Sequence, residues 1–207
     1  MGAHPNCPSK LQATGESLQA FLERHPQMLG GKVQQHFGTQ LPFLFKVLSV
    51  NKALSIQSHP DKALAEKLHA EHPKLYADPN HKPELALALS DFEALCGFVT
   101  TPVLQERLRL VPELAVLVGQ EAAAAVLALG EGEDEAKAKQ VLRAAFTALM
   151  TASPDAVLEA VRGLVARLGA ATRALSEHEA LALRLNGQFP DDVGVLSAFF
   201  LNVSAGY

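Results

Sequence analysis

From about Thr100 onward the sequence is rich in Ala and Leu, repeats its apolar residues at helical spacing and has few clusters of β-branched residues. Apolar residues that recur every three to four positions form one face of a helix. Between two such stretches stands "SPD", in which Ser153 is expected to cap a helix and Pro154 to occupy its first position. We therefore predict a helical bundle, with helices near residues 101–110, 120–129, 133–150, 154–169, 175–187 and 191–200.

The first half of the chain, up to about Gly97, mixes Pro, aromatic and β-branched residues with shorter helical patches. The stretches "ESLQAFLERHP" and "DKALAEKLHAEHPKLY" predict helices. Strands are expected over "LPFLFKVLSV" and "KALSIQSH", joined by a hairpin through "VNK", and over "ELALALS" and "ALCGFVT". These patterns predict an α+β fold class in which little of the sheet is present and most of the chain is helical.

Composition and charge exclude several classes of protein. The 207 residues carry a formal net charge of -4 without a cluster of Lys and Arg, which argues against a nucleic-acid partner. No apolar run approaches the length of a membrane span, and the opening "MGAHPNCPSK" lacks the basic start and apolar core of a signal peptide. The two cysteines, Cys7 and Cys96, favour a reduced compartment. We expect a cytoplasmic protein of one large domain or two small ones.

Polar residues alternate with apolar ones along "LSIQSHPDK". In a strand, this alternation would put Ser55, Gln57 and His59 on one face, opposite Leu54 and Ile56. Neighbours on one strand face are roughly 6.5–7 Å apart, close enough for two side chains to converge on one ion. A polar face of this kind more often meets solvent, however. The alternation alone therefore favours a solvated strand end over a metal site.

Two further features favour a site. Lys46 is flanked by large apolar residues in "FLFKVLSV", and because burial of an unpaired charge is unfavourable, it must face water or an internal polar cavity. Glu84 leads an alternating face of small residues in "ELALALS", which leaves room for a ligand, although a lone Glu at a strand start is ordinarily solvated. Gln57, His59 and Glu84 together offer two oxygens and one nitrogen. With one more imidazole, this ligand set suits a catalytic Zn²⁺. The same ligands could also bind other divalent ions.

Several motifs of the first half resemble a single family. "LPFLFKVLSV" is followed by "LSIQSHPDK" and then by "YADPNHKPE", and the chain opens on "MGAHP", where the family usually reads M-G-T-H-P. This combination is highly specific, and over residues 1 to about 98 it resembles the type I phosphomannose isomerases. A weaker resemblance continues through the helical half to "GQFPDDVGVLSAFFLN".

The resemblance implies a zinc site. Gln57, His59 and Glu84 match the zinc ligands of the family, and one Zn²⁺ is expected per chain. The fourth ligand of the family is a histidine, and its active site also has an arginine. Both belong to segments beyond Tyr207, so the resemblance identifies no catalytic residue within this chain.

The resemblance also implies a substrate and a reaction. Lys46, Ser55 and Lys82 match positions that line the family's substrate cavity, with the lysines as contacts to phosphate or sugar. The family interconverts mannose 6-phosphate and fructose 6-phosphate by moving a proton between C1 and C2 through an enediol or enediolate, and zinc can stabilise the charge on oxygen. The expected partner is thus a small sugar phosphate, bound by a monomer in the metabolism that supplies GDP-mannose.

Three parts of the chain follow from the resemblance. Residues 1–98 are expected to form a partial catalytic domain of cupin (jelly-roll) type, residues 99–203 a helical insertion domain, and residues 204–207 the start of the next segment. Two alternatives stay open. One is an inactive, truncated form that acts at most as a sugar-phosphate-binding or interaction module. The other is a cupin-type sugar-binding protein that keeps the metal but has no turnover.

Overall fold

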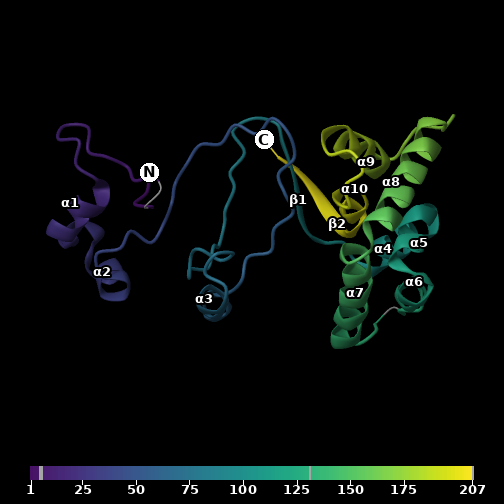
Figure 1. Ribbon diagram of the computed structural model, residues 1–207, viewed down its shortest axis with the longest axis horizontal. Helices are drawn as coiled ribbons and strands as arrows, with labels where there is room; N and C mark the ends of the chain where they lie inside the picture. Colours follow the sequence, from purple (N-terminus) through teal and green to yellow (C-terminus); the bar gives the residue numbers. More distant parts are fainter. Residues whose placement is uncertain (5–6, 131, 207) are drawn as a thin grey trace. The chain divides into compact units, whose positions relative to one another are not determined.

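The computed structural model describes residues 1–4, 7–130 and 132–206, without the side chains of residues 205 and 206. The chain divides into two compact units, residues 1–51 and residues 52–207. Figure 1 shows the helices and strands of each unit. None of the described helices is by itself long and apolar enough to cross a membrane. Among the described residues, α7 (Glu135–Met150) and α8 (Pro154–Gly169) reach that length when taken together, but they are bent by 95° at their junction.

The helices of the first unit are α1 (Leu18–Arg24), the 3-10 helix η1 (Pro26–Leu29) and α2 (Gly31–Phe37). Ser17 caps α1, because its hydroxyl accepts a hydrogen bond from the Ala20 N–H at 3.2 Å. The start of the chain lies beside a later segment of the same unit: the Phe45 N–H donates to the Met1 carbonyl at 2.8 Å. The Met1 ammonium donates in turn to the Phe45 carbonyl, so a reciprocal pair of hydrogen bonds joins these two segments.

The second unit contains the helical bundle. The Ser153 hydroxyl accepts a hydrogen bond from the Ala156 N–H at 3.3 Å and Pro154 stands in the first turn, so α8 begins as predicted. The helices of this unit are α3 (Lys62–Glu71), α4 (Thr101–Leu110), α5 (Pro112–Val118), α6 (Gln120–Leu127), α7 (Glu135–Met150), α8 (Pro154–Gly169), α9 (Glu177–Gln188) and α10 (Gly194–Ser197), followed by the 3-10 helix η2 (Ala198–Phe200).

The hydrophobic core of the second unit lies among α4 to α10 and η2. Each of these helices turns an apolar face inward, and full burial of one such side chain stabilises the fold by about 1.5–3 kcal/mol. A bidentate ion pair also joins α5 to α8, with Arg167 Nε and Nη2 donating to the Glu113 carboxylate at 2.7 and 2.8 Å. The largest fully buried side chains include Leu114, Leu149, Leu164, Leu196, Phe199 and Phe200.

Two antiparallel strands, β1 (Phe92–Phe98) and β2 (Leu201–Gly206), form the sheet of the described residues. Their register shifts between Leu95 and Phe98, where Gly97 takes a φ of 70° that a side chain would disfavour. The rings of Phe98 and Phe200 both meet Phe146 of α7 edge to face, at centroid distances of 5.0 and 5.4 Å. The Phe98–Phe146 contact therefore joins β1 to α7, and the Phe146–Phe200 contact joins α7 to η2.

The structure corrects most of the strand predictions. "ALCGFVT" contributes to β1, but residues 41–50, 52–59 and 84–90 belong to no strand and run as irregular segments (Figure 1). Their apolar side chains are mostly exposed: Phe45 is 63% exposed, Val47 75% and Leu85 93%. A strand is stable only when a neighbour satisfies its backbone N–H and C=O groups. Among the described residues no partner strand lies against these segments, so the predicted hairpin is absent.

The helix predictions are closer to the structure. The helices expected near 101–110, 133–150 and 154–169 begin and end within two residues of α4, α7 and α8. The helix expected over 191–200 is instead the short α10 followed by η2, and α2 and α5 were not predicted. For α5 the signals were present, because Pro112 stands in its first turn and Gly119 just after its end. The predicted fold class, α+β and mostly helical, is confirmed.

Candidate metal centre

Two of the predicted metal ligands come from separate irregular segments and lie side by side. The Nε2 atom of His59 is 3.4 Å from Oε2 of Glu84. The His59 side chain is 28% exposed and the Glu84 side chain 73% exposed. Both donor atoms can therefore be reached from solvent, which a metal ion and a small substrate require.

Lys62, in the first turn of α3, holds together the segments on which these ligands stand. Its ammonium group donates to the Pro79 carbonyl at 3.2 Å and to the Asn80 side-chain oxygen at 2.9 Å. The loop that contains Asn80 leads directly to Glu84. Lys62 was not predicted to have this role, and its place in the motif "HPDK" was the only sequence signal for it.

The start of α3 fixes the position of His59 from the other side. The Asp61 carboxylate accepts a hydrogen bond from the Leu64 N–H at 2.8 Å and caps the helix. Pro60, between the cap and His59, cannot donate a backbone hydrogen bond and holds its own φ near -65°. The imidazole thus stands directly before a capped helix rather than within a flexible stretch.

Gln57 and Ser55 contact each other two positions before His59. The Gln57 amide nitrogen Nε2 donates to the Ser55 hydroxyl oxygen at 2.9 Å. Since the nitrogen end of the amide has this partner, the carbonyl oxygen of Gln57 is the end that can bind a cation. The alternation in the sequence had placed these two side chains on one side of the segment, and they do meet, although the segment is not a strand.

The donor atoms fit zinc. Zn²⁺ binds nitrogen and oxygen at about 2.0–2.2 Å in a tetrahedron, so two neighbouring ligand atoms stand about 3.3–3.5 Å apart. The 3.4 Å between His59 Nε2 and Glu84 Oε2 has this value. In the part of the chain that the structure describes, no group of three or more His, Cys, Asp or Glu side chains is placed to hold a metal ion. Gln57, the third ligand predicted from the sequence, stands two positions before His59 and contacts Ser55, so its place in the metal centre stays a prediction.

The two lysines predicted to contact substrate lie in different units. Lys46 belongs to the first unit and Lys82, two positions before Glu84, to the second. Both are exposed, so Lys46 meets water, the first of the two arrangements that its apolar neighbours allowed. Within the described residues neither ammonium group makes a hydrogen bond or an ion pair, and each can accept an anion as partner.

Comparison with known proteins covers nearly the whole chain. Residues 1–101 match the family pattern described as phosphomannose isomerase type I, catalytic domain, and residues 117–201 match that of its helical insertion domain. Mannose-6-phosphate isomerase 1 of Arabidopsis thaliana is 47% identical over 208 residues, which are 98% of this chain and 48% of the relative. Mannose-6-phosphate isomerase of Saccharomyces cerevisiae is 41% identical over 213 residues, 97% of this chain and 49% of the relative.

A solved structure gives the same result. The zinc-bound, holo form of a mannose 6-phosphate isomerase matches with a TM-score of 0.77 and 31% sequence identity, and covers 100% of this chain and 52% of that one. The chain spans about half the length of the curated relatives it matches. Both family patterns and these relatives agree, and the chain belongs to the type I phosphomannose isomerase family.

Proposed function

We propose that this chain supplies three zinc ligands and part of the substrate cavity of a mannose-6-phosphate isomerase, an enzyme that interconverts mannose 6-phosphate and fructose 6-phosphate. The observation that carries the proposal is the 3.4 Å between His59 Nε2 and Glu84 Oε2, a spacing suited to two ligands of one zinc ion. The relatives named mannose-6-phosphate isomerase support the choice of reaction.

Gln57, His59 and Glu84 are the residues that would hold the ion. Zinc, when bound, stabilises the negative charge that develops on a substrate oxygen while a proton moves between C1 and C2. Glu84 is the one carboxylate of the set, so the charge of the ion is only partly neutralised. Ser55 contributes by accepting the hydrogen bond that orients the Gln57 amide.

Lys46, Ser55 and Lys82 are the proposed contacts to the substrate. A phosphate dianion prefers ammonium or guanidinium partners, and the ammonium groups of both lysines are exposed. The Ser55 oxygen accepts a hydrogen bond from Gln57, while its own proton can be donated to a sugar oxygen. The fourth zinc ligand and the active-site arginine would come from the half of the relatives' length that this chain does not span.

The domain organisation and setting are part of the proposal. We place a partial catalytic domain of cupin type over residues 1–98, the helical insertion domain over residues 99–203 and the start of the next segment at residues 204–207. The enzyme would act as a monomer in the cytoplasm and supply mannose 6-phosphate for GDP-mannose synthesis.

The proposal is tested on the longest form of the protein that its gene encodes. Isomerase activity on mannose 6-phosphate is measured with added Zn²⁺, together with the zinc content of the purified protein. His59→Ala and Glu84→Gln are expected to lower the zinc content well below one ion per chain and to abolish turnover. His72→Ala and Glu71→Gln, at the exposed end of α3, are matched controls that should leave both unchanged. Wild-type zinc content in both ligand variants would refute the assignment.

A second candidate function applies to residues 1–207 by themselves. Among the described residues the apolar segments 41–50 and 84–90 have no strand partner, and the proposed ligand set has three of the four zinc ligands that the family resemblance implies. These observations favour an inactive form that binds a sugar phosphate or another protein. Turnover of mannose 6-phosphate by the isolated 207-residue chain would rule this candidate out.

A further inference from the structure

The segment that carries Ser55, Gln57 and His59 is fixed to the helical bundle at its upstream end. The Ala53 N–H donates a hydrogen bond of 2.7 Å to Oε1 of Gln188, the last residue of α9. The two residues are 135 positions apart in the chain. The Gln188 side-chain oxygen therefore fixes the position of the backbone at the upstream end of this segment.

A second contact lies beside this hydrogen bond. The Lys52 ammonium stands 5.0 Å from the centre of the Phe189 ring, a cation–π contact of ordinary length. The side chain of Ala53 is also packed against the hydrophobic core of the bundle. Consecutive residues of the segment, 52 and 53, thus meet consecutive residues of the bundle, 188 and 189.

The corner after α9 provides a fixed base for these contacts. Asp191 takes a φ of 62°, rare for a residue with a side chain, and two side chains hold it there. The Asn186 side-chain oxygen accepts a hydrogen bond from the Asp191 N–H at 3.1 Å. Arg162 of α8 donates to both oxygens of the Asp191 carboxylate at 3.2 and 3.0 Å. Since two helices restrain the corner, Gln188 has a defined position.

Beyond Ala53 the segment packs loosely. Leu54, Ser55 and Ile56 form one wall of a groove of about 310 Å³, whose other lining residues include Phe189 and Val193. Contact is sparse, and Leu54 remains 69% exposed. Residues 54–56 are thus held less tightly than residues 52 and 53, and among the contacts of those two residues the Ala53–Gln188 hydrogen bond is the one that fixes the backbone itself.

We propose that Gln188 is a positioning residue of the zinc site: by accepting the Ala53 N–H it fixes the register of residues 53–59, and with it the place of the Gln57 and His59 donor atoms. This inference rests on the proposed function. In an extended segment, a slip by one residue turns every side chain to the opposite side. Zinc ligands tolerate displacements of only about 0.5 Å. A backbone anchor four residues before Gln57 therefore controls the affinity of the site without touching the ion.

The test uses the longest form of the protein that its gene encodes, with Zn²⁺ itself as the probe. Gln188→Met keeps the size of the side chain but removes the acceptor, and Gln188→Glu keeps an acceptor oxygen. Gln105→Met is the matched control, because Gln105 donates to carbonyls at the end of α6, within the bundle and outside the contacts of residues 53–59. Zinc affinity is measured by competition with a chelator well below the unfolding temperature. Hydrogen exchange is measured on peptides that span residues 52–60.

Gln188→Met is expected to weaken zinc binding about 10-fold, as loss of a supporting contact typically does, and to speed exchange within residues 53–59. Gln188→Glu should restore both to near the wild-type values. Gln105→Met should lower the unfolding temperature and leave zinc affinity unchanged. A purely structural role of Gln188 would instead lower the unfolding temperature without changing zinc affinity.

Wild-type zinc affinity in Gln188→Met, or equal impairment in Gln188→Glu and Gln188→Met, would overturn the proposal. Rapid exchange of the Ala53 N–H in the wild-type protein would also overturn it, and that measurement does not depend on whether a variant folds. Failure of the proposed function would give a different result, because His59→Ala and Glu84→Gln would then retain zinc. Faster hydrogen exchange of residues 53–59 in Gln188→Met would still show that Gln188 holds this segment.

Discussion

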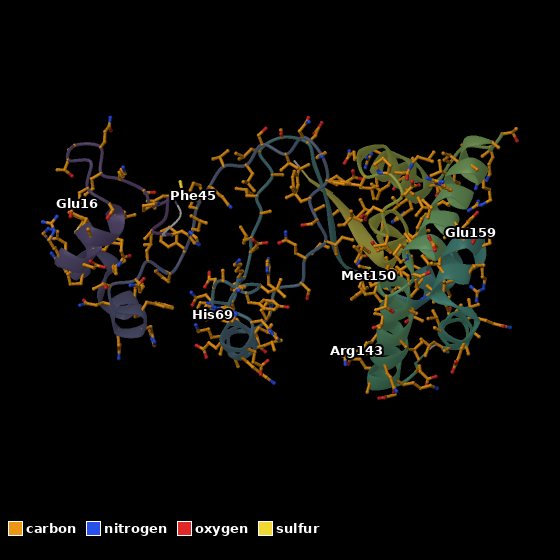
Figure 2. All side chains as sticks on the ribbon, in the orientation of Figure 1. Glu16, Phe45, His69, Arg143, Met150 and Glu159 are labelled. Carbon is orange, nitrogen blue, oxygen red and sulfur yellow. The ribbon has the colours of Figure 1, made fainter. Side chains whose placement is uncertain are left out.

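The imidazole of His59 and the carboxylate of Glu84 stand 3.4 Å apart, although one precedes α3 and the other follows the loop beyond it. Figure 2 shows the α3 region with its side chains, including the labelled His69. His69 adds a contact within this region, because its Nδ1 atom lies 2.6 Å from the Tyr76 carbonyl oxygen. Together with Lys62 this contact folds the loop back along the helix. The helix and its returning loop thus place the two donors as neighbours.

Ser55→Ala is expected to weaken zinc binding about 10-fold without changing the ligands themselves. The Ser55 hydroxyl accepts the hydrogen bond from Gln57 Nε2, and without it the amide can rotate its oxygen away from the ion. Competition with a chelator measures the effect. Ser58→Ala, in the same segment but outside this hydrogen bond, is the control and should bind zinc as the wild-type protein does. Equal affinities for the two variants would show that the hydrogen bond does not orient the ligand.

Glu179 makes the start of α9 sensitive to acid. The hydrogen bonds from Arg173 are the largest cause that lowers the pKa of Glu179 from 4.5 to about 2, with Ser176 assisting and burial opposing. A carboxyl whose folded-state pKa is depressed stabilises the protein above its unfolded pKa. This stability is present above about pH 4.5 and is lost as the pH falls toward 2.

Glu179→Gln should therefore lower the thermal midpoint at pH 7 by a few degrees, and the difference from the wild-type protein should shrink as the pH falls from 4.5 toward 2. Gln retains an oxygen for the Ser176 N–H but has no charge for Arg173. Thermal unfolding by circular dichroism at several pH values measures both effects. The control is Glu121→Gln, an exposed position in the first turn of α6, which should unfold as the wild-type protein does. A difference that stays constant down to pH 2 would argue against the predicted titration.

His178 should also destabilise the fold as the pH falls, but nearer neutral pH than Glu179 does. Burial is the first cause that lowers its pKa and the charge of Arg107 the second, while Glu177, Glu93 and a backbone hydrogen bond oppose the shift. The Nε2 atom of His178 meets the Arg107 guanidinium, whose Nη1 also donates to the Phe199 carbonyl at 2.7 Å. In the folded state the imidazole is therefore held neutral as the acceptor of an Arg hydrogen bond.

Because the unfolded state binds the proton of His178 more readily, the free energy of unfolding should decrease as the pH falls below about 6.5. His178→Gln offers Arg107 a neutral acceptor that does not titrate. Between pH 6.5 and 5 the wild-type midpoint should fall by a few degrees more than that of the variant. His72→Gln, an exposed histidine at the end of α3, is expected to follow the wild-type curve. Parallel curves for His178→Gln and the wild-type protein would contradict the predicted effect.

Local features of the sequence predicted the helical half well. Ser153 and Pro154 start α8 because a cap and a first-turn proline act within one turn of the helix. The alternation around Gln57 and His59 by itself favoured a solvated strand end, and the ligand set with Glu84 came from the resemblance of whole motifs and stays a prediction. The strand predictions over 41–50, 52–59 and 84–90 were wrong, since pairing depends on a neighbour that no local pattern specifies.

The sequence by itself determined where most helices lie and which side chains could bind a cation, because helix hydrogen bonds and donor chemistry are properties of residues close together in the chain. Only the tertiary structure decided that His59 meets Glu84 and that Ala53 meets Gln188. These contacts join residues that are distant in the chain. Their distances depend on the path of the whole backbone between them, through the capped helix α3 in the first case and the packed bundle in the second.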